Sequence, residues 1–291
     1  VVSAGVRKGI ERAALILMPL LFLILIGLAI WASALDGTGP GYAYYLAPAW
    51  SDLLDPGVVA DAAGQTYFSM SLGMGASLTF ASYMRDDANL VKEGTIVAFS
   101  DFSVAFIAGL VVFPVVFALG FSHQVIGLGA SEAEGVLFIA LPGAFATMGP
   151  AGRILGLVFF SALSVAALTS TISLLEVVVS SVMDEWRVPR RTAALAAGGL
   201  VVLLGLAPSF SLSVLSLMNA VAGEIALALG AFLTVIAVGW FVQNPDEELR
   251  NGGNATTRWL APGWLAVVRY VLPIVTGAVL AFMIWDVVVA G

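Results

Sequence analysis

The chain has 291 residues, of which 60% are hydrophobic and only 11% are charged, and its formal net charge is −7. A soluble core of this size does not need so much apolar surface, and the 12 Lys and Arg residues are too scattered to form a phosphate-binding stripe for nucleic acid. There is no cysteine, which excludes disulfides and thiolate metal sites. The composition predicts a polytopic protein of the lipid bilayer.

Hydropathy predicts seven membrane spans in chain order. They lie near 13–34, 57–83, 95–120, 153–184, 192–208, 212–242 and 262–289. Residues 135–148 are apolar but too short and too rich in Pro and Gly to cross, so they fit a re-entrant hairpin within an extracellular segment near 121–152. The odd number of spans, together with a first residue that is not Met, predicts that an N-terminal portion precedes this chain.

The distribution of Lys and Arg predicts the orientation. Eleven of the 12 basic residues fall on one side of the predicted spans, and only Arg153 falls on the other. By the positive-inside rule, the N-terminus of this chain is expected in the cytoplasm. The expected location is the plasma membrane.

The first span contains a proline, Pro19, which nine residues separate from Gly9. The pair predicts a cytoplasmic helix end that unwinds easily, and hence a hinge. Kinks without such a role are equally common in membrane helices, and that alternative stays open.

The second span is interrupted at its centre by Gly73 and Gly75. A helix that opens in mid-bilayer leaves peptide N–H and C=O groups without partners, which costs several kcal/mol per group in hydrocarbon unless protein, water, ion or substrate supplies them. Ser69 and Ser71 come just before the glycines, so two hydroxyls and the freed carbonyls can converge on a small polar ligand. The alternative is a glycine-mediated surface for helix packing.

The third span contains an acid, Asp101. An unpaired carboxylate inside a span costs roughly 2.5 to 3.5 kcal/mol on the insertion scale, so we expect Asp101 to face a cation or a polar cavity. The alternative is a structural acid that snorkels toward the cytoplasmic end.

The fourth span is rich in hydroxyl side chains. Within it, Ala166, Thr169 and Ser170 have the i, i+3, i+4 spacing that gathers them on one helical face. Two hydroxyl oxygens and a carbonyl suit a hard cation such as sodium. Membrane Ser and Thr also bond to the carbonyl of the preceding turn, which is the alternative. Glu176 in this span and Glu224 in the sixth are further candidates, because intramembrane acids are functional by default.

In this order, these motifs resemble the neurotransmitter:sodium symporter family, in particular its prokaryotic, leucine-transporter-like branch of sodium-dependent amino-acid transporters. The resemblance begins at residues 5–12, is strongest from Ser71 to Tyr83, and returns at residues 167–172. It implies an all-α, leucine-transporter-like fold built on an inverted repeat. This chain would be a partial transporter domain that corresponds to transmembrane helices five to eleven of that fold.

The resemblance implies a substrate pocket around an unwound backbone, with Phe68 as its aromatic lid. The lining would be Phe68, Ser69, Ser71, Leu72, Gly73, Met74, Ser170 and Leu174. Ser69 and Asp101 would hold one sodium ion, and Ala166, Thr169 and Ser170 a second. Sodium is thus the expected coupling ion, with no further cofactor. Gln65 would lie near the family's chloride or carboxylate site, but Ala105 replaces a residue that decides anion dependence, so chloride is left undecided.

The resemblance also implies gates at both ends of the pocket. The cytoplasmic gate would include Ser82, Tyr83, Glu176 and Asp184, and Gly9 with Pro19 would match the motif that unwinds helix five. Asn219 stands where the outer gate often has an acid, so a salt-bridged outer gate is not implied, although Glu224 could substitute.

The sequence therefore predicts sodium-coupled symport of a neutral amino acid or a related small amine by alternating access. The expected partners are the amino acid, sodium ions and the bilayer, and a homodimer is left open. Alternatives are a carrier of a betaine-like osmolyte or another solute, and a fragment that does not transport without the first four helices. An enzyme is not expected, because no span contains histidine and Asp101 has no second aspartate near it in sequence.

Overall fold

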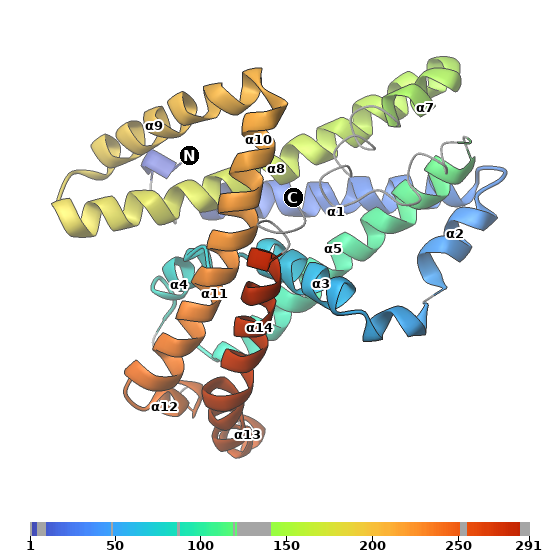
Figure 1. Ribbon diagram of the computed structural model, residues 1–291. Helices are drawn as coiled ribbons and strands as arrows, with labels where there is room; N and C mark the ends of the chain where they lie inside the picture. Colours follow the sequence, from blue (N-terminus) through green and yellow to red (C-terminus); the bar gives the residue numbers. More distant parts are fainter. Residues whose placement is uncertain are drawn as a thin grey trace. The chain divides into compact units, whose positions relative to one another are not determined.

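The computed structural model describes residues 2–4, 10–47, 49–85, 88–118, 120, 141–250 and 255–285. In this part of the chain the regular structure is entirely helical, which confirms the all-α prediction (Figure 1). The chain divides into two compact units. Unit 1 comprises Val1–Ala49 and Phe102–Ser173, and unit 2 comprises Trp50–Asp101 and Leu174–Gly291.

Six helical segments in the described residues are long and apolar enough to cross a membrane. They are Glu11–Ser33, Leu90–Ala118, Gly149–Trp186, Arg190–Phe210, Ser213–Phe241 and Ala261–Trp285. The segment near 57–83 is not among them because it forms two shorter helices, α3 (Pro56–Ser69) and α4 (Ala76–Ala81). Exposed apolar side chains such as Leu23 and Leu157 are numerous on the six helices, as expected for surfaces that face lipid.

Unit 1 is built around α1 (Glu11–Ser33), α2 (Gly39–Leu46), α7 (Leu141–Thr147) and the parts of α5 (Leu90–Ala118) and α8 (Gly149–Trp186) that belong to it. One apolar cluster joins four of these helices: Leu28, Ala32, Val111, Val115, Val116, Phe145 and Phe159. The helix α1 continues through Pro19 in this conformation. Gly9 lies outside the described residues, as do residues 121–140, which include the first part of the expected hairpin.

The short helix α2 packs closely on α5 in unit 1. A Cβ atom at Gly41 would lie 2.6 Å from the Cα of Pro114, so only glycine fits at this point of contact. The Tyr45 hydroxyl donates to the Phe106 carbonyl oxygen at 3.3 Å, and burial raises the pKa of this hydroxyl. It therefore stays neutral and able to donate at physiological pH.

Unit 2 begins with a short 3₁₀ helix, η3 (Trp50–Leu54), and contains α3, α4 and the remaining parts of α5 and α8. It continues with α9 (Arg190–Phe210), α10 (Leu212–Met218), α11 (Ala226–Ile236), α12 (Pro245–Arg250), α13 (Ala255–Ala266) and α14 (Leu272–Trp285). Three π-helices lie between them: η7 (Asn219–Ile225), η8 (Ala237–Phe241) and η9 (Val267–Val271).

The core of unit 2 lies where α11 packs against α3 and α14 (Figure 1). Its buried residues are Tyr67, Leu227, Ala228, Ala231 and Val279. Because α3 ends only two residues after Tyr67, this core anchors the end of the helix at which the chain opens.

Candidate functional site

The helix of the second predicted span opens between Ser69, the last residue of α3, and Ala76, the first of α4. Three residues in this break, Ser71, Gly73 and Gly75, have φ angles of +53°, +85° and +78°. Left-handed backbone of this kind costs a residue with a Cβ roughly 1–2 kcal/mol and costs glycine little. Glycine therefore suits two of the three positions, while Ser71 adopts this conformation despite its side chain.

The start of the break keeps part of its backbone bonding. The N–H groups of Met70, Ser71 and Leu72 donate to carbonyl oxygens of the last turn of α3 at 2.8–3.0 Å. The Ser77 hydroxyl donates across the break to the Met70 carbonyl oxygen at 3.3 Å. These bonds hold the break in a defined shape, which a binding site requires.

The break brings Ser69 and Asp101 together in unit 2. The Ser69 hydroxyl donates to the Asp101 carboxylate at 2.6 Å, although the two residues are 32 apart in the sequence. A carboxylate and a hydroxyl at this separation offer two oxygens to one hard cation. These are the two side chains that the family resemblance assigns to one sodium ion.

The second predicted sodium site lies on α8 in unit 1. The Thr169 hydroxyl donates to the Ala166 carbonyl oxygen at 2.8 Å, and the Ser173 hydroxyl donates to the Thr169 carbonyl oxygen at 3.1 Å. In this conformation Thr169 bonds to the carbonyl of the preceding turn, which is the alternative to ion binding given above. The same bond holds the Thr169 and Ala166 oxygens side by side, close enough to share a cation. Ser170 is exposed on the same helix.

The predicted substrate-binding residues of unit 2 differ in how they are placed. The side chains of Phe68 and Leu72 are exposed, with 57% and 36% of their surfaces accessible. Met74 instead packs against the buried cluster that contains Leu227. Leu174, on α8, is exposed in the same unit.

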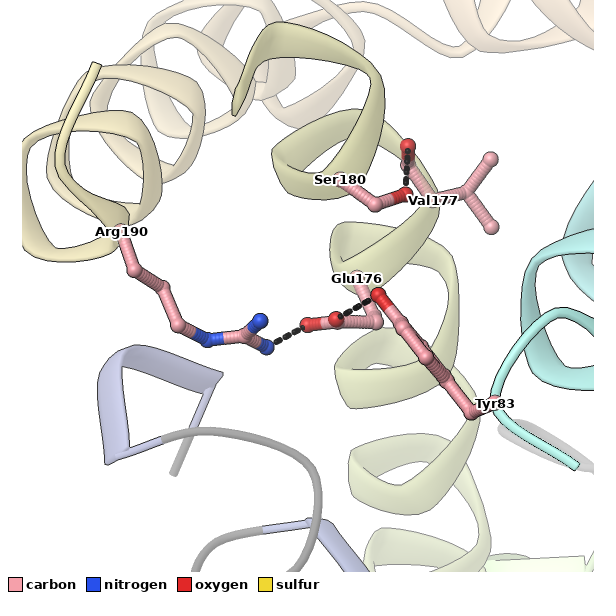
Figure 2. A network of polar contacts seen from close by, with 5 residues as sticks. All are labelled: Tyr83, Glu176, Val177, Ser180 and Arg190. Carbon is pink, nitrogen blue, oxygen red and sulfur yellow. Dashed lines mark hydrogen bonds and ion pairs between the residues drawn. The ribbon is translucent and has the colours of Figure 1, made fainter. Parts of the chain in front are cut away.

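The predicted cytoplasmic gate contains a polar network around one buried carboxylate, and Arg190 joins it although its position was not among the predicted gate residues (Figure 2). Glu176 is 0% exposed, and its carboxylate accepts a hydrogen bond of 2.8 Å from the Tyr83 hydroxyl. The second carboxylate oxygen pairs with the guanidinium of Arg190, the first residue of α9. A buried carboxylate needs such partners, because transfer of an unpaired charge out of water is expensive.

The other predicted gate residues lie apart from this network. The Ser82 hydroxyl donates to the Thr79 carbonyl oxygen within its own turn, at 2.7 Å. Asp184 is exposed on α8, eight residues beyond Glu176 and hence roughly 12 Å further along the helix. The position of Arg190 had a signal in the sequence: only residues 187–189 separate α8 from α9, and short links make neighbouring helices antiparallel.

The predicted outer-gate position, Asn219, lies in the π-helix η7. Its side-chain amide donates to the Glu224 carboxylate at 3.2 Å. Side chains five residues apart do not usually meet on an α-helix, whereas the i→i+5 bonding of a π-helix brings them onto one face. Glu224 therefore lies beside the outer-gate position, which hydropathy and helical spacing did not indicate.

Comparison with known proteins places these features in a family context. The profile of the sodium:neurotransmitter symporter family matches residues 1–290. An uncharacterised sodium-dependent transporter of Methanocaldococcus jannaschii, MJ1319, is 30% identical over an alignment 300 residues long, which covers 100% of this chain and 60% of the relative. The uncharacterised sodium-dependent transporter YhdH of Bacillus subtilis is 29% identical over an alignment 287 residues long, which covers 94% of this chain and 61% of the relative.

A solved structure supports the same relation at the level of the fold. The crystal structure of MhsT in complex with L-phenylalanine is 36% identical, with a TM-score of 0.81, over 96% of this chain and 64% of MhsT. The leucine-transporter-like fold expected from the sequence is thereby confirmed. The chain spans about 60% of the length of the curated relatives that it matches.

Proposed function

Because the chain belongs to the sodium:neurotransmitter symporter family, we propose that its protein uses the sodium gradient to take up a neutral amino acid by alternating access. The relatives are named as sodium-dependent transporters, which supports sodium as the coupling ion. The complex of MhsT with L-phenylalanine supports an amino acid as the substrate. We place the protein in the plasma membrane, with the N-terminus of this chain in the cytoplasm.

The observation that carries this proposal is the contact between Ser69 and Asp101 at the break. A carboxylate inside a span is costly unless a cation or a hydrogen-bond donor compensates it. Asp101 has a hydroxyl donor at 2.6 Å and lies beside a stretch of opened backbone, so sodium would find anionic and neutral oxygens together. The charge of this ion would also favour the carboxylate of an amino acid nearby.

The predicted pocket supports a neutral substrate side chain. Phe68, Leu72, Met74 and Leu174 are apolar, and Ser69, Ser71 and Ser170 carry hydroxyls. A charged substrate side chain would lose its hydration here without gaining an ionic partner from this set. We expect Phe68 to cover the bound amino acid, since its ring is exposed next to the break.

The second sodium would bind at Ala166, Thr169 and Ser170 and stabilise the outward-facing state. For this ion to bind, the Thr169 hydroxyl would turn its proton away from the Ala166 carbonyl oxygen, so that both oxygens point to the cation. Opening of the predicted hinge at Gly9 and Pro19 would then admit water to this site, and release of the ion to the cytoplasm would follow.

Uptake into liposomes tests the proposal. The full-length protein is reconstituted, and uptake of radiolabelled L-phenylalanine and other neutral amino acids is measured with an inward sodium gradient. A matched assay replaces sodium with choline. Uptake that requires sodium and is competed by other neutral amino acids supports the proposal, and uptake that is equal in choline rejects it.

A further inference from the structure

We propose that Gly230, on α11, is a positioning residue for the break: because it has no side chain, α11 lies directly against the Gly73 backbone and sets where the opened segment rests. This inference depends on the proposed function, since it assigns a role to the site described above. Gly230 is not itself a ligand in the proposal. It acts on sodium and substrate through Gly73.

The contact between the two glycines is one of backbone on backbone. A Cβ at Gly230 would lie 2.3 Å from the carbonyl oxygen of Gly73, and a Cβ at Gly73 would lie 2.5 Å from both the Ala231 nitrogen and the Leu227 carbonyl oxygen. Real Cβ atoms essentially never come so close to another heavy atom. Neither position therefore accepts a methyl group unless the break or α11 moves.

The helix α11 is the less mobile of the two partners. Leu227, Ala228 and Ala231 are buried on the face that bears this contact, where they pack against Tyr67 and Val279. Close-packed interiors of this kind resist the displacement of a helix. The break is not part of a regular helix, so an added methyl group would displace the Gly73 carbonyl rather than α11.

Such a displacement would reach the proposed sodium ligands. Gly73 is four residues from Ser69, whose hydroxyl lies 2.6 Å from Asp101. To relieve a 2.3 Å contact to an ordinary separation, the Gly73 oxygen has to move by about 1 Å. A misplacement of that size can lower the rate at a preorganised site by about 100-fold. Here we expect it to weaken the binding of sodium as well as of substrate.

Thr234 also influences the contact between Gly230 and Gly73. Its hydroxyl donates to the Gly230 carbonyl oxygen at 2.8 Å. A hydroxyl bonded to the preceding turn bends a helix slightly. Thr234 therefore sets the local curvature of α11 at the residue that touches Gly73.

The chain contains a matched control for this pair. Gly205, on α9, also has a carbonyl that accepts a side-chain bond from four residues ahead, because the Ser209 hydroxyl donates to it at 2.7 Å. A Cβ at Gly205 would meet nothing within 4 Å. Gly205→Ala thus repeats the change in helix propensity without the clash.

The test measures the sodium concentration that gives half-maximal amino-acid uptake by the full-length protein in liposomes. We expect Gly230→Ala to raise this concentration at least tenfold or to abolish uptake, and Gly205→Ala to stay within twofold of the wild type. If wild-type uptake depends on sodium and Gly230→Ala behaves like Gly205→Ala, the positioning role is wrong while the transport function stands. Wild-type uptake that is indifferent to sodium rejects the proposed function itself.

If Gly230→Ala does not fold, a pair of variants at Thr234 tests the positioning role of Gly230. Thr234→Val keeps the shape of the side chain but removes its bond to Gly230, and Thr234→Ser retains that bond. We expect Thr234→Val to raise the half-maximal sodium concentration about threefold and Thr234→Ser to leave it unchanged. If the half-maximal concentration is unchanged in Thr234→Val, or if it rises equally in both variants, the positioning role is rejected.

Discussion

At the residue scale, the Ser69–Asp101 pair concentrates the proposed ion chemistry in two side chains. Asp101→Asn keeps the size of the side chain but removes its charge, so we expect it to raise the half-maximal sodium concentration by more than tenfold. Ser69→Ala removes a neutral ligand, and it should have a smaller effect in the same direction. Sodium titration of amino-acid uptake measures both. Ser100→Ala, one residue before Asp101, is the control, and equal behaviour of Asp101→Asn and this control would contradict the assignment.

A second prediction at the residue scale concerns Glu176, whose carboxylate is fully buried and whose charge Arg190 compensates. Removal of one partner from a buried ion pair destabilises a protein by about 3–5 kcal/mol, because the other charge stays buried without compensation. We therefore expect Arg190→Gln to lower the temperature of unfolding in detergent. The double variant with Glu176→Gln should recover most of the loss.

The neighbouring Arg191 provides the control for this cycle, since it is exposed at the next position of the same helix. Arg191→Gln should leave the unfolding temperature within about a degree of the wild type, as for other exposed charges. If the double variant is no more stable than Arg190→Gln alone, the pairing of Arg190 with Glu176 is not what stabilises this region.

At the scale of the element, the contact between α2 and α5 depends on a single glycine. A methyl group at Gly41 would lie 2.6 Å from Pro114 Cα and 2.7 Å from the Phe113 carbonyl oxygen, both of them backbone atoms. Overpacking of a close contact costs typically 1–3 kcal/mol, so Gly41→Ala should lower the unfolding temperature. Gly39→Ala, in the same helix but in open space, should not. Equal effects of the two variants would show that the contact does not constrain α2.

The break depends in part on contacts that the sequence does not reveal. Its position follows from two glycines inside an apolar segment. The positive φ of Ser71 does not, because serine favours this region only when the surrounding structure holds it there. Nor does the contact with Gly230, because 156 residues separate Gly73 from Gly230 and hydropathy carries no information about which segments meet.

The π-helices show a second limit of sequence patterns. Hydropathy predicts one continuous span at 212–242, and this segment contains two π-helices, η7 and η8. The apolar pattern reports which face is buried, but it does not report whether a backbone N–H bonds four or five residues back. The meeting of Asn219 and Glu224 depends on that difference, so it could not be predicted from helical spacing.

At the scale of the whole molecule, cysteine labelling tests the predicted orientation, and no native cysteine of this chain competes for the label. We expect a cysteine at Ser51, in η3, to react with a membrane-impermeant maleimide on intact cells. A cysteine at Gln243, after η8, should react only after the membrane is made permeable. Both positions are exposed, so access to the side chain does not limit either reaction. The reverse pattern would overturn the predicted orientation.

Much of the molecule follows from its apolar segments and a few polar interruptions, whereas the pairing of helices does not. The acid in the third span and the hydroxyls of the fourth were recognisable because polar groups are costly in a bilayer. Arg190 did not stand out by this criterion, since a basic residue at the start of a span is ordinary, and only the short link between the two helices pointed to its position. Its role emerges only from the turn that returns α9 toward Glu176.

Two helices, α5 and α8, contribute residues to both units of the chain. The division falls between Asp101 and Phe102 in α5 and between Ser173 and Leu174 in α8, and in both places the helix continues without interruption. The chain therefore passes between the units twice through continuous helical backbone, whereas its third passage, between Ala49 and Trp50, lies outside an α-helix. Asp101 lies at the first of these two helical points and Thr169 lies four residues before the second, so each predicted sodium site includes a residue of a helix that both units share.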